Sequence, residues 1–88
     1  NHDHTHTREV VNRLARAICH LQKVKQMVAD GEDCSQVLVQ LAAVKSALNS
    51  TGKVILKDHL EHCIVHAVED GDTEVLTELS DAIDRFVK

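Results

Sequence analysis

Apolar residues recur at three- and four-residue steps through most of the chain. The first run spans about residues 7–29 and is followed by Gly31, a residue that commonly ends helices. Its apolar positions are Val11, Leu14, Ile18, Leu21, Val24 and Val28. This spacing gathers them on one stripe of an amphipathic helix. We therefore predict a helix over about residues 7–29.

A second periodic run begins near residue 34 and continues to about residue 66. Asp33 followed by Gln36 resembles a capping box with Asp in place of Ser or Thr, which predicts that Cys34 lies in the first turn. The run contains a polar, glycine-bearing interruption at residues 49–52. The interruption is short, so we predict one long helix that is locally weakened at Gly52, in preference to two helices joined by a loop.

A third helix is expected over about residues 73–87, after a break at Gly71 and Asp72. Val75, Leu76, Leu79, Ile83 and Phe86 form its apolar side. Residues 1–6 are rich in histidine and are expected to be a flexible segment ahead of a single domain at residues 7–88.

The composition supports an all-α fold and association with a second copy. The chain has 88 residues, one aromatic residue, no Pro and three Gly. So short a chain buries a modest core unless it associates. Two long helices that leave apolar stripes uncovered predict an antiparallel four-helix-bundle dimer, with the third helix adding a further contact surface.

Cysteine count and hydropathy bear on the compartment. Three cysteines are an odd number, which argues against a disulfide framework and for thiol chemistry in a reducing compartment. No segment approaches the ~20 consecutive apolar residues of a membrane span, and no signal segment opens the chain. A cytoplasmic location without a membrane partner is therefore expected.

Charge is distributed unevenly between the two halves. Residues 1–57 carry eight Lys or Arg against five acids, whereas residues 58–88 carry two against nine. The basic half would suit a nucleic-acid partner, although ordinary surface patterning gives the same counts.

Cys34, His59 and Cys63 are the candidate metal ligands. In a continuous helix Cys34 lies roughly 38 Å from His59, so one protomer cannot close the site. His59 and Cys63 are four residues apart and share a helical face. An antiparallel partner helix would bring Cys34 of the partner subunit against them, which makes the predicted site intersubunit. The alternative is a coincidence of two buried cysteines and a surface histidine. Cys19 is expected to be a small buried residue outside the site.

Three runs carry a resemblance to a known family: residues 12–16 (NRLAR), 34–44 (CSQVLVQLAAV) and 58–63 (DHLEHC), together with Glu78. The chain resembles the CsoR/RcnR family of metal-sensing transcriptional repressors from about Val10 to Phe86. The resemblance implies a three-helix protomer, a bundle dimer that pairs into a flat tetramer, and release of operator DNA on metal binding. Metal efflux or resistance genes would then be derepressed.

The same resemblance implies roles for individual residues. Cys34 of one protomer, with His59 and Cys63 of the other, matches the positions that hold Cu(I) in the copper-sensing branch, and two thiolates with one imidazole suit that soft ion. Arg13, Arg16 and Lys53 match basic DNA-binding positions. Ser50 departs from the pattern, because copper sensors have Arg there.

Three more residues complete the implied site. Glu78 matches an acidic position that accepts a hydrogen bond from the metal-bound histidine. A second position near the ligands, just before the first cysteine, is often Tyr in the family and is Asp33 here. Nickel is an open alternative, because His2 stands where nickel-sensing relatives recruit a fourth ligand, and two Cys with two His suit square-planar Ni(II).

The sequence also bears on two further classes of protein. A cytoplasmic metal-binding protein that regulates no gene would use the same bundle and ligands. An enzyme is not expected, because the chain has no glycine-rich phosphate loop and no convincing acid–base pair.

Overall fold

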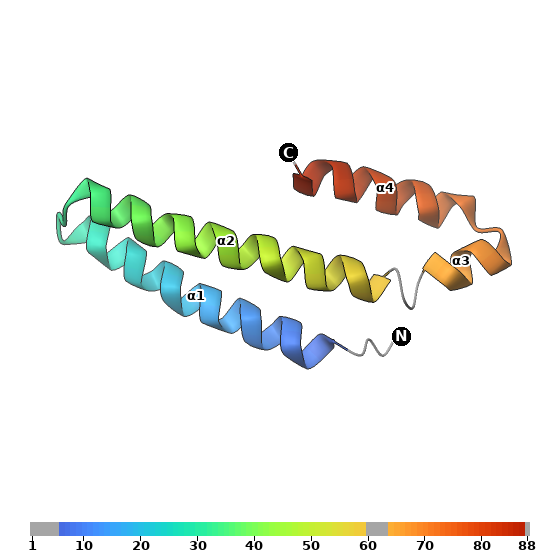
Figure 1. Cartoon of the computed structure of the whole chain (residues 1–88), viewed down its shortest axis with the longest axis horizontal. Coiled ribbons are helices and arrows are strands. Elements are labelled where there is room, and N and C mark those ends of the chain that lie inside the picture. Colours follow the sequence, from blue (N-terminus) through green and yellow to red (C-terminus); the bar gives the residue numbers. More distant parts are fainter. Residues whose placement is uncertain (1–5, 60–63, 88) are drawn as a thin grey trace.

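The computed structural model describes residues 6–59 and 64–87, and every element in those ranges is a helix. The helices are α1 (Thr7–Ala29), α2 (Cys34–His59), α3 (Val65–Asp70) and α4 (Thr73–Val87). Figure 1 shows α1 and α2 running side by side, with α4 folded back beyond the far edge of α2. The all-α prediction is confirmed for the described part of the chain, and the bounds of α1 and α4 agree with those predicted.

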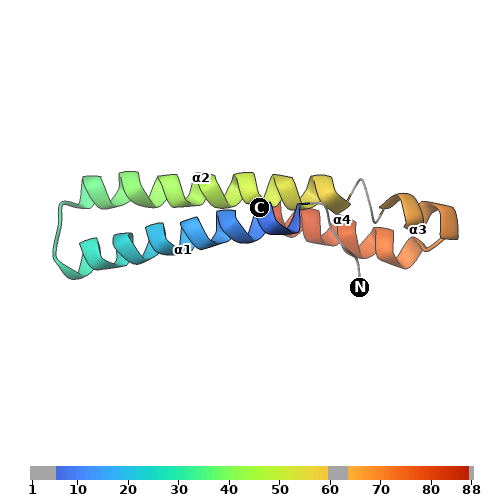
Figure 2. The ribbon, with the colours of Figure 1, turned by 90° about the horizontal axis from the view of Figure 1, so that it is seen from below.

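The turn between α1 and α2 forms a tight antiparallel hairpin (Figure 2). The N–H groups of Gly31 and Glu32 donate to the carbonyls of Val28 (3.1 Å) and Met27 (3.0 Å), which closes the last turn of α1. Gly31 has φ 72°, a left-handed conformation that glycine adopts without the cost of a Cβ. Asp33 Oδ2 then accepts a bond from the backbone N–H of Gln36 at 3.3 Å, so the predicted N-terminal cap of α2 is confirmed.

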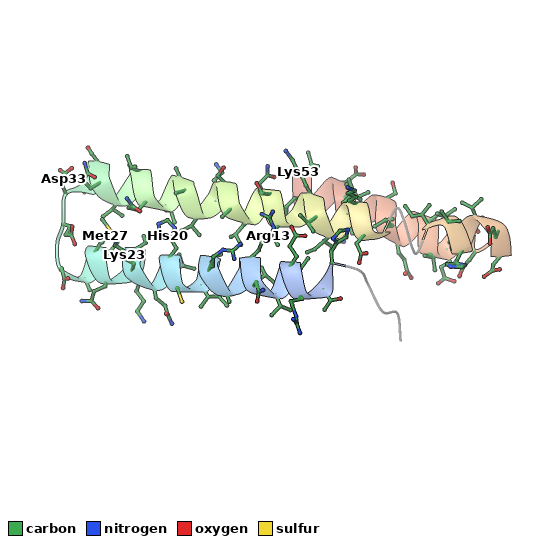
Figure 3. The ribbon with its side chains drawn as sticks, turned by 60° about the horizontal axis from the view of Figure 1, so that its bottom comes forward. Arg13, His20, Lys23, Met27, Asp33 and Lys53 are labelled. Carbon is green, nitrogen blue, oxygen red and sulfur yellow. The ribbon has the colours of Figure 1, made fainter. Side chains whose placement is uncertain are left out.

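The core is a narrow seam between α1 and α2. Its buried members are Ala17, Val24 and Met27 of α1 and Val44 and Thr51 of α2. They recur at three- and seven-residue steps, as expected for two helices packed along their lengths. Figure 3 shows His20 and Met27 lying between the two helices. His20 Nε2 lies 2.8 Å from Gln40 Oε1, a hydrogen bond that links α1 to α2 across the seam.

The predicted apolar stripe of α1 is divided between two surroundings. Val24 is 4% exposed in the seam, whereas Val11 and Ile18 are 56% and 57% exposed. The apolar residues of α1 cover an arc too wide for one neighbouring helix to bury, because α2 contacts only the arc centred on Ala17 and Val24. The other residues of the stripe form a separate surface.

Helix α2 passes through Gly52 without interruption, so the alternative of a loop at residues 49–52 is wrong. The ring of Phe86 from α4 lies directly against Gly52, and a Cβ at that position would overlap it. Glycine therefore permits the close approach of α4 to α2. Beside this contact, α2 and α4 line a mostly apolar cavity of about 480 Å³ that is open to solvent on one side. Its wall includes Ile55, Leu79 and Ile83.

The second half of the chain differs from the predicted three helices. Val65 and His66, expected at the end of the long second helix, belong to the separate short helix α3. Residues 60–63, which join α2 to α3, lie outside the described part of the chain. The described residues fall into four helices where three were predicted. The break at Gly71 and Asp72 is confirmed: Gly71 has φ 68°, and Asp72 Oδ1 caps α4 by accepting the Val75 N–H at 3.2 Å.

The protomer is elongated and leaves much apolar surface uncovered. Its radius of gyration is 17.0 Å, whereas a compact domain of this length would have about 12 Å. The uncovered aliphatic residues that flank the seam form what we call the outer stripe. It consists of Val11, Leu14, Ile18, Leu21 and Val28 on α1 and Leu38, Leu41, Leu48 and Ile55 on α2. So much exposed aliphatic surface is typical of an association face. Among the described helices none is long and apolar enough to cross a membrane.

Candidate metal centre and nucleic-acid interface

Cys34 is the first residue of α2, and its thiol is exposed. The Asp33 cap fixes where the helix begins and so fixes the position of Cys34. Leu38 and Leu41 follow it by four and seven residues, which places Cys34 at the N-terminal end of the outer stripe. An exposed thiol, the candidate soft ligand, therefore lies at one end of an uncovered apolar surface.

His59 is the last residue of α2 and belongs to the same stripe by its register. Twenty-five residues of helix separate it from Cys34, which corresponds to roughly 38 Å along the axis. The two positions therefore do not meet within one protomer. The His59 side chain, Cys63 and His2 lie outside the described part of the structure. Among the side chains that are described, no three His, Cys, Asp or Glu gather as a metal-binding group.

The structure also locates Glu78 and Cys19. Glu78 is on α4 and is exposed. Cys19 is exposed on α1, so the expectation that it is buried is wrong. It immediately precedes His20, and about 100° of helical rotation turns it away from the seam that the neighbouring residues line.

The predicted basic residues fall into two places. Arg13 and Arg16 line one small cleft between α1 and α2. Lys53 lies on the opposite side of α2, where it borders the cavity next to α4 (Figure 3). Arg13 Nε donates to Glu9 Oε2 at 3.0 Å, and this hydrogen bond lowers the pKa of the exposed Glu9 carboxyl. The structure thus brings together two of the three candidate DNA-binding residues.

The cleft also contains residues that the sequence did not single out. His20 of α1 and Thr51 of α2 complete its polar lining, beside Ala17 and Ala47. The side-chain hydroxyl of Thr51 donates to the Ala47 carbonyl at 2.9 Å. The signal for His20 was present, because Arg13, Arg16 and His20 follow one another at three- and four-residue steps on a predicted helix.

The helical hairpin carries an exposed thiol at the start of α2 and a basic cleft between α1 and α2. Comparisons with known proteins give its class, a metal-sensitive transcriptional repressor. Residues 6–85 match the family described as "Metal-sensitive transcriptional repressor". The copper-sensing transcriptional repressor CsoR of Bacillus subtilis is 33% identical over 81 residues, which cover 91% of this chain and 80% of that protein. The chain belongs to this family, the CsoR/RcnR family, whose members are regulators and not enzymes.

Two solved structures extend the comparison to the fold. The copper-sensing repressor CsoR with Cu(I) from Geobacillus thermodenitrificans superposes with a TM-score of 0.87 at 32% identity, covering 100% of this chain and 93% of that one. The nickel-responsive transcriptional regulator InrS superposes with a TM-score of 0.75 at 42% identity, covering 97% of each chain. The fold is therefore shared by a copper-sensing and a nickel-responsive protein.

Proposed function

We propose that this protein is a copper-responsive transcriptional repressor. It binds operator DNA in the absence of metal and leaves it when Cu(I) binds between subunits, so that metal efflux or resistance genes are expressed. The relatives described as copper-sensing repressors support this assignment. A reducing cytoplasm would keep the Cys34 thiol available for the ion.

The observation that carries the proposal is the position of Cys34 at one end of the outer stripe of α2, with His59 in register at the other end. Two copies of α2 that pair antiparallel about a twofold axis cover their apolar stripes and bring opposite ends together. Cys34 of one protomer then lies beside the partner's His59 and the partner's Cys63. The twofold axis creates two such sites in each dimer, and a pair of dimers would form the tetramer.

The donor set fits Cu(I). Two thiolates and one imidazole are soft ligands that satisfy a low-coordinate ion, whereas Zn²⁺ commonly takes four. A histidine that binds metal through one ring nitrogen donates its other N–H to an acceptor. Glu78 is our candidate acceptor, because it lies on α4, whose Phe86 contacts α2. The hydrogen bond would make the position of α4 depend on occupancy of the site.

DNA binding is assigned to Arg13 and Arg16 in the cleft and to Lys53 on the other side of α2. Each of these basic side chains releases counterions from the duplex when it contacts a phosphate. The affinity for DNA should therefore fall as the salt concentration rises. Coupling to metal is expected to weaken DNA affinity by about 1–3 kcal/mol.

The testing experiment is an anaerobic competition titration of the reduced protein with Cu(I) and a high-affinity Cu(I) chelator, followed by DNA binding with and without the ion. We expect one Cu(I) per protomer, loss of binding in Cys34→Ala and Cys63→Ala, and DNA release by metal only in the wild type. Tight metal binding without salt-dependent affinity for duplex DNA would instead identify a metal-binding protein that regulates no gene.

A nickel-responsive repressor is the second candidate, favoured by the 42% identity to InrS. In that case His2 supplies the fourth ligand of a planar Ni(II) site together with the two cysteines and His59. A planar Ni(II) absorption spectrum that disappears in His2→Ala would establish it. Cu(I) affinity indifferent to His2→Ala would favour the copper assignment.

A further inference from the structure

The cleft between α1 and α2 has the chemistry of an anion-binding site. We call it the basic cleft; it measures about 110 Å³ and is lined by Arg13, Arg16, Ala17, His20, Ala47 and Thr51. Two arginines and a histidine thus line a hollow whose lining includes no acidic residue. The Glu9 carboxylate binds Arg13 through Nε, which uses one of the five N–H donors of the guanidinium.

The position of the basic cleft keeps it accessible after the protomers pair. At about 100° per residue, Arg13 and His20 lie at the edge of the seam and Arg16 lies just beyond it, on the side of α1 away from Val11 and Ile18. Covering the outer stripe with a second protomer would therefore leave this edge of the hairpin turned outward. Figure 3 shows Arg13 and His20 projecting from α1 toward α2 along this edge.

His20 is held at the wall of the cleft by a bond that spans the two helices. Its Nε2 lies 2.8 Å from Gln40 Oε1, so the imidazole orientation is fixed by α2 although the residue belongs to α1. The remaining α2 contributors are Ala47 and Thr51, neither of which is charged. Thr51 directs its proton to the Ala47 carbonyl, so its contact with an occupant would be as an acceptor or through water.

We infer that the basic cleft binds a single phosphate group of the DNA backbone, with His20 as a contact residue beside Arg13 and Arg16. Guanidinium groups bind phosphate oxygens through paired N–H donors, and a hollow this small suits one phosphate better than a base. The inference rests on the proposed function in one respect, because it takes duplex DNA as the source of the phosphate. It assigns His20 a positioning contact on the backbone that carries no sequence information.

The test measures binding of a random-sequence duplex by fluorescence anisotropy at several KCl concentrations. Arg16→Ala is expected to lower affinity about tenfold and to reduce the slope of log affinity against log salt by about one. His20→Ala should lower affinity several-fold. Arg8→Ala is the matched control, because it removes a charge from the same helix outside the cleft; its affinity should change less than twofold. Circular dichroism and Cu(I) stoichiometry confirm that each variant is folded.

The outcomes separate this inference from the proposed function. If the wild type binds DNA and releases it with Cu(I), but Arg16→Ala and His20→Ala behave like Arg8→Ala, the cleft assignment is overturned and the repressor assignment stands. If the wild type does not bind DNA, the repressor assignment fails, and a ¹⁵N NMR titration with inorganic phosphate decides the cleft. A saturable shift of the His20 imidazole would support an anion site for free phosphate, and its absence would refute the site.

Discussion

An intersubunit metal site makes a quantitative prediction for mixtures of two inactive variants. Cys34→Ala and His59→Ala should each abolish tight Cu(I) binding, because each removes a ligand from both sites of its own homodimer. In a mixed dimer, one of the two symmetry-related sites contains both substitutions. The other site keeps all three ligands: Cys34 from one subunit, the partner's His59 and the partner's Cys63. The mixed dimer should therefore regain one intact site.

The expected recovery follows from the geometry and from random pairing. Random pairing of equal amounts makes half of the dimers mixed, each with one intact site out of two, so the mixture should bind about a quarter of the wild-type Cu(I). If each site closed within one protomer, the mixture would bind no Cu(I), because every protomer lacks one ligand. The roughly 38 Å between Cys34 and His59 along α2 excludes that arrangement.

The assay is a chelator competition on variants that are unfolded, mixed and refolded together without oxygen. Variants refolded separately and combined just before measurement are the control, and these should show little recovery until subunits exchange. Failure of the refolded mixture to recover any capacity, with subunit exchange verified by mass spectrometry, would refute the intersubunit site.

Three further predictions follow from the packing. Val44→Ala should lower the free energy of unfolding by about 2 kcal/mol in urea titrations at fixed protein concentration, because Val44 is 2% exposed in the seam. Arg13→Ala should raise the lowered pKa of Glu9, measured by NMR titration of its carboxyl. Gly52→Ala should stabilise α2 by about 1 kcal/mol only when combined with Phe86→Ala, because its Cβ otherwise displaces the ring.

Each of these has a control or a contradicting result. Ser46→Ala, on the exposed side of α2, should leave urea stability nearly unchanged. The Glu9–Arg13 pair favours the folded state above the ordinary carboxyl pKa, and that contribution is lost as the pH falls through the lowered pKa. An unchanged Glu9 titration in Arg13→Ala would contradict the hydrogen-bond explanation. Equal effects of Gly52→Ala with and without Phe86 would contradict the α2–α4 contact.

Helix ends were predictable because their signals are local. Gly31, Asp33 and Gly71 act through the backbone within a few residues, so the bounds of α1, the start of α2 and the start of α4 follow from the sequence. Continuity of α2 through Gly52 also followed, from the short length of the polar interruption. The reason for the glycine did not, because Phe86 lies 34 positions away in the chain and no local pattern indicates that they touch.

The divided surface of α1 shows a second limit of the sequence. Val24 and Val28 have the same side chain and both fit a helical stripe, yet only Val24 enters the seam. Periodicity identifies apolar residues but not which of two neighbours will cover them. The proposed metal ligands are a similar case: spacing singled out Cys34 and His59 as candidates and showed that they lie too far apart to meet in one protomer. Their proposed convergence would require a second copy of the chain, which no local pattern describes.

The contact between Gly52 and Phe86 has a practical consequence. The chain contains no Trp or Tyr, and Phe86 is its single aromatic residue. Near-ultraviolet absorption by copper–thiolate charge transfer would therefore be recorded against almost no protein background. A fluorinated or isotopically labelled phenylalanine would likewise give one aromatic signal, located where α4 rests on α2. That signal can follow the same contact in the metal-free, metal-loaded and DNA-bound protein without any substitution in the chain.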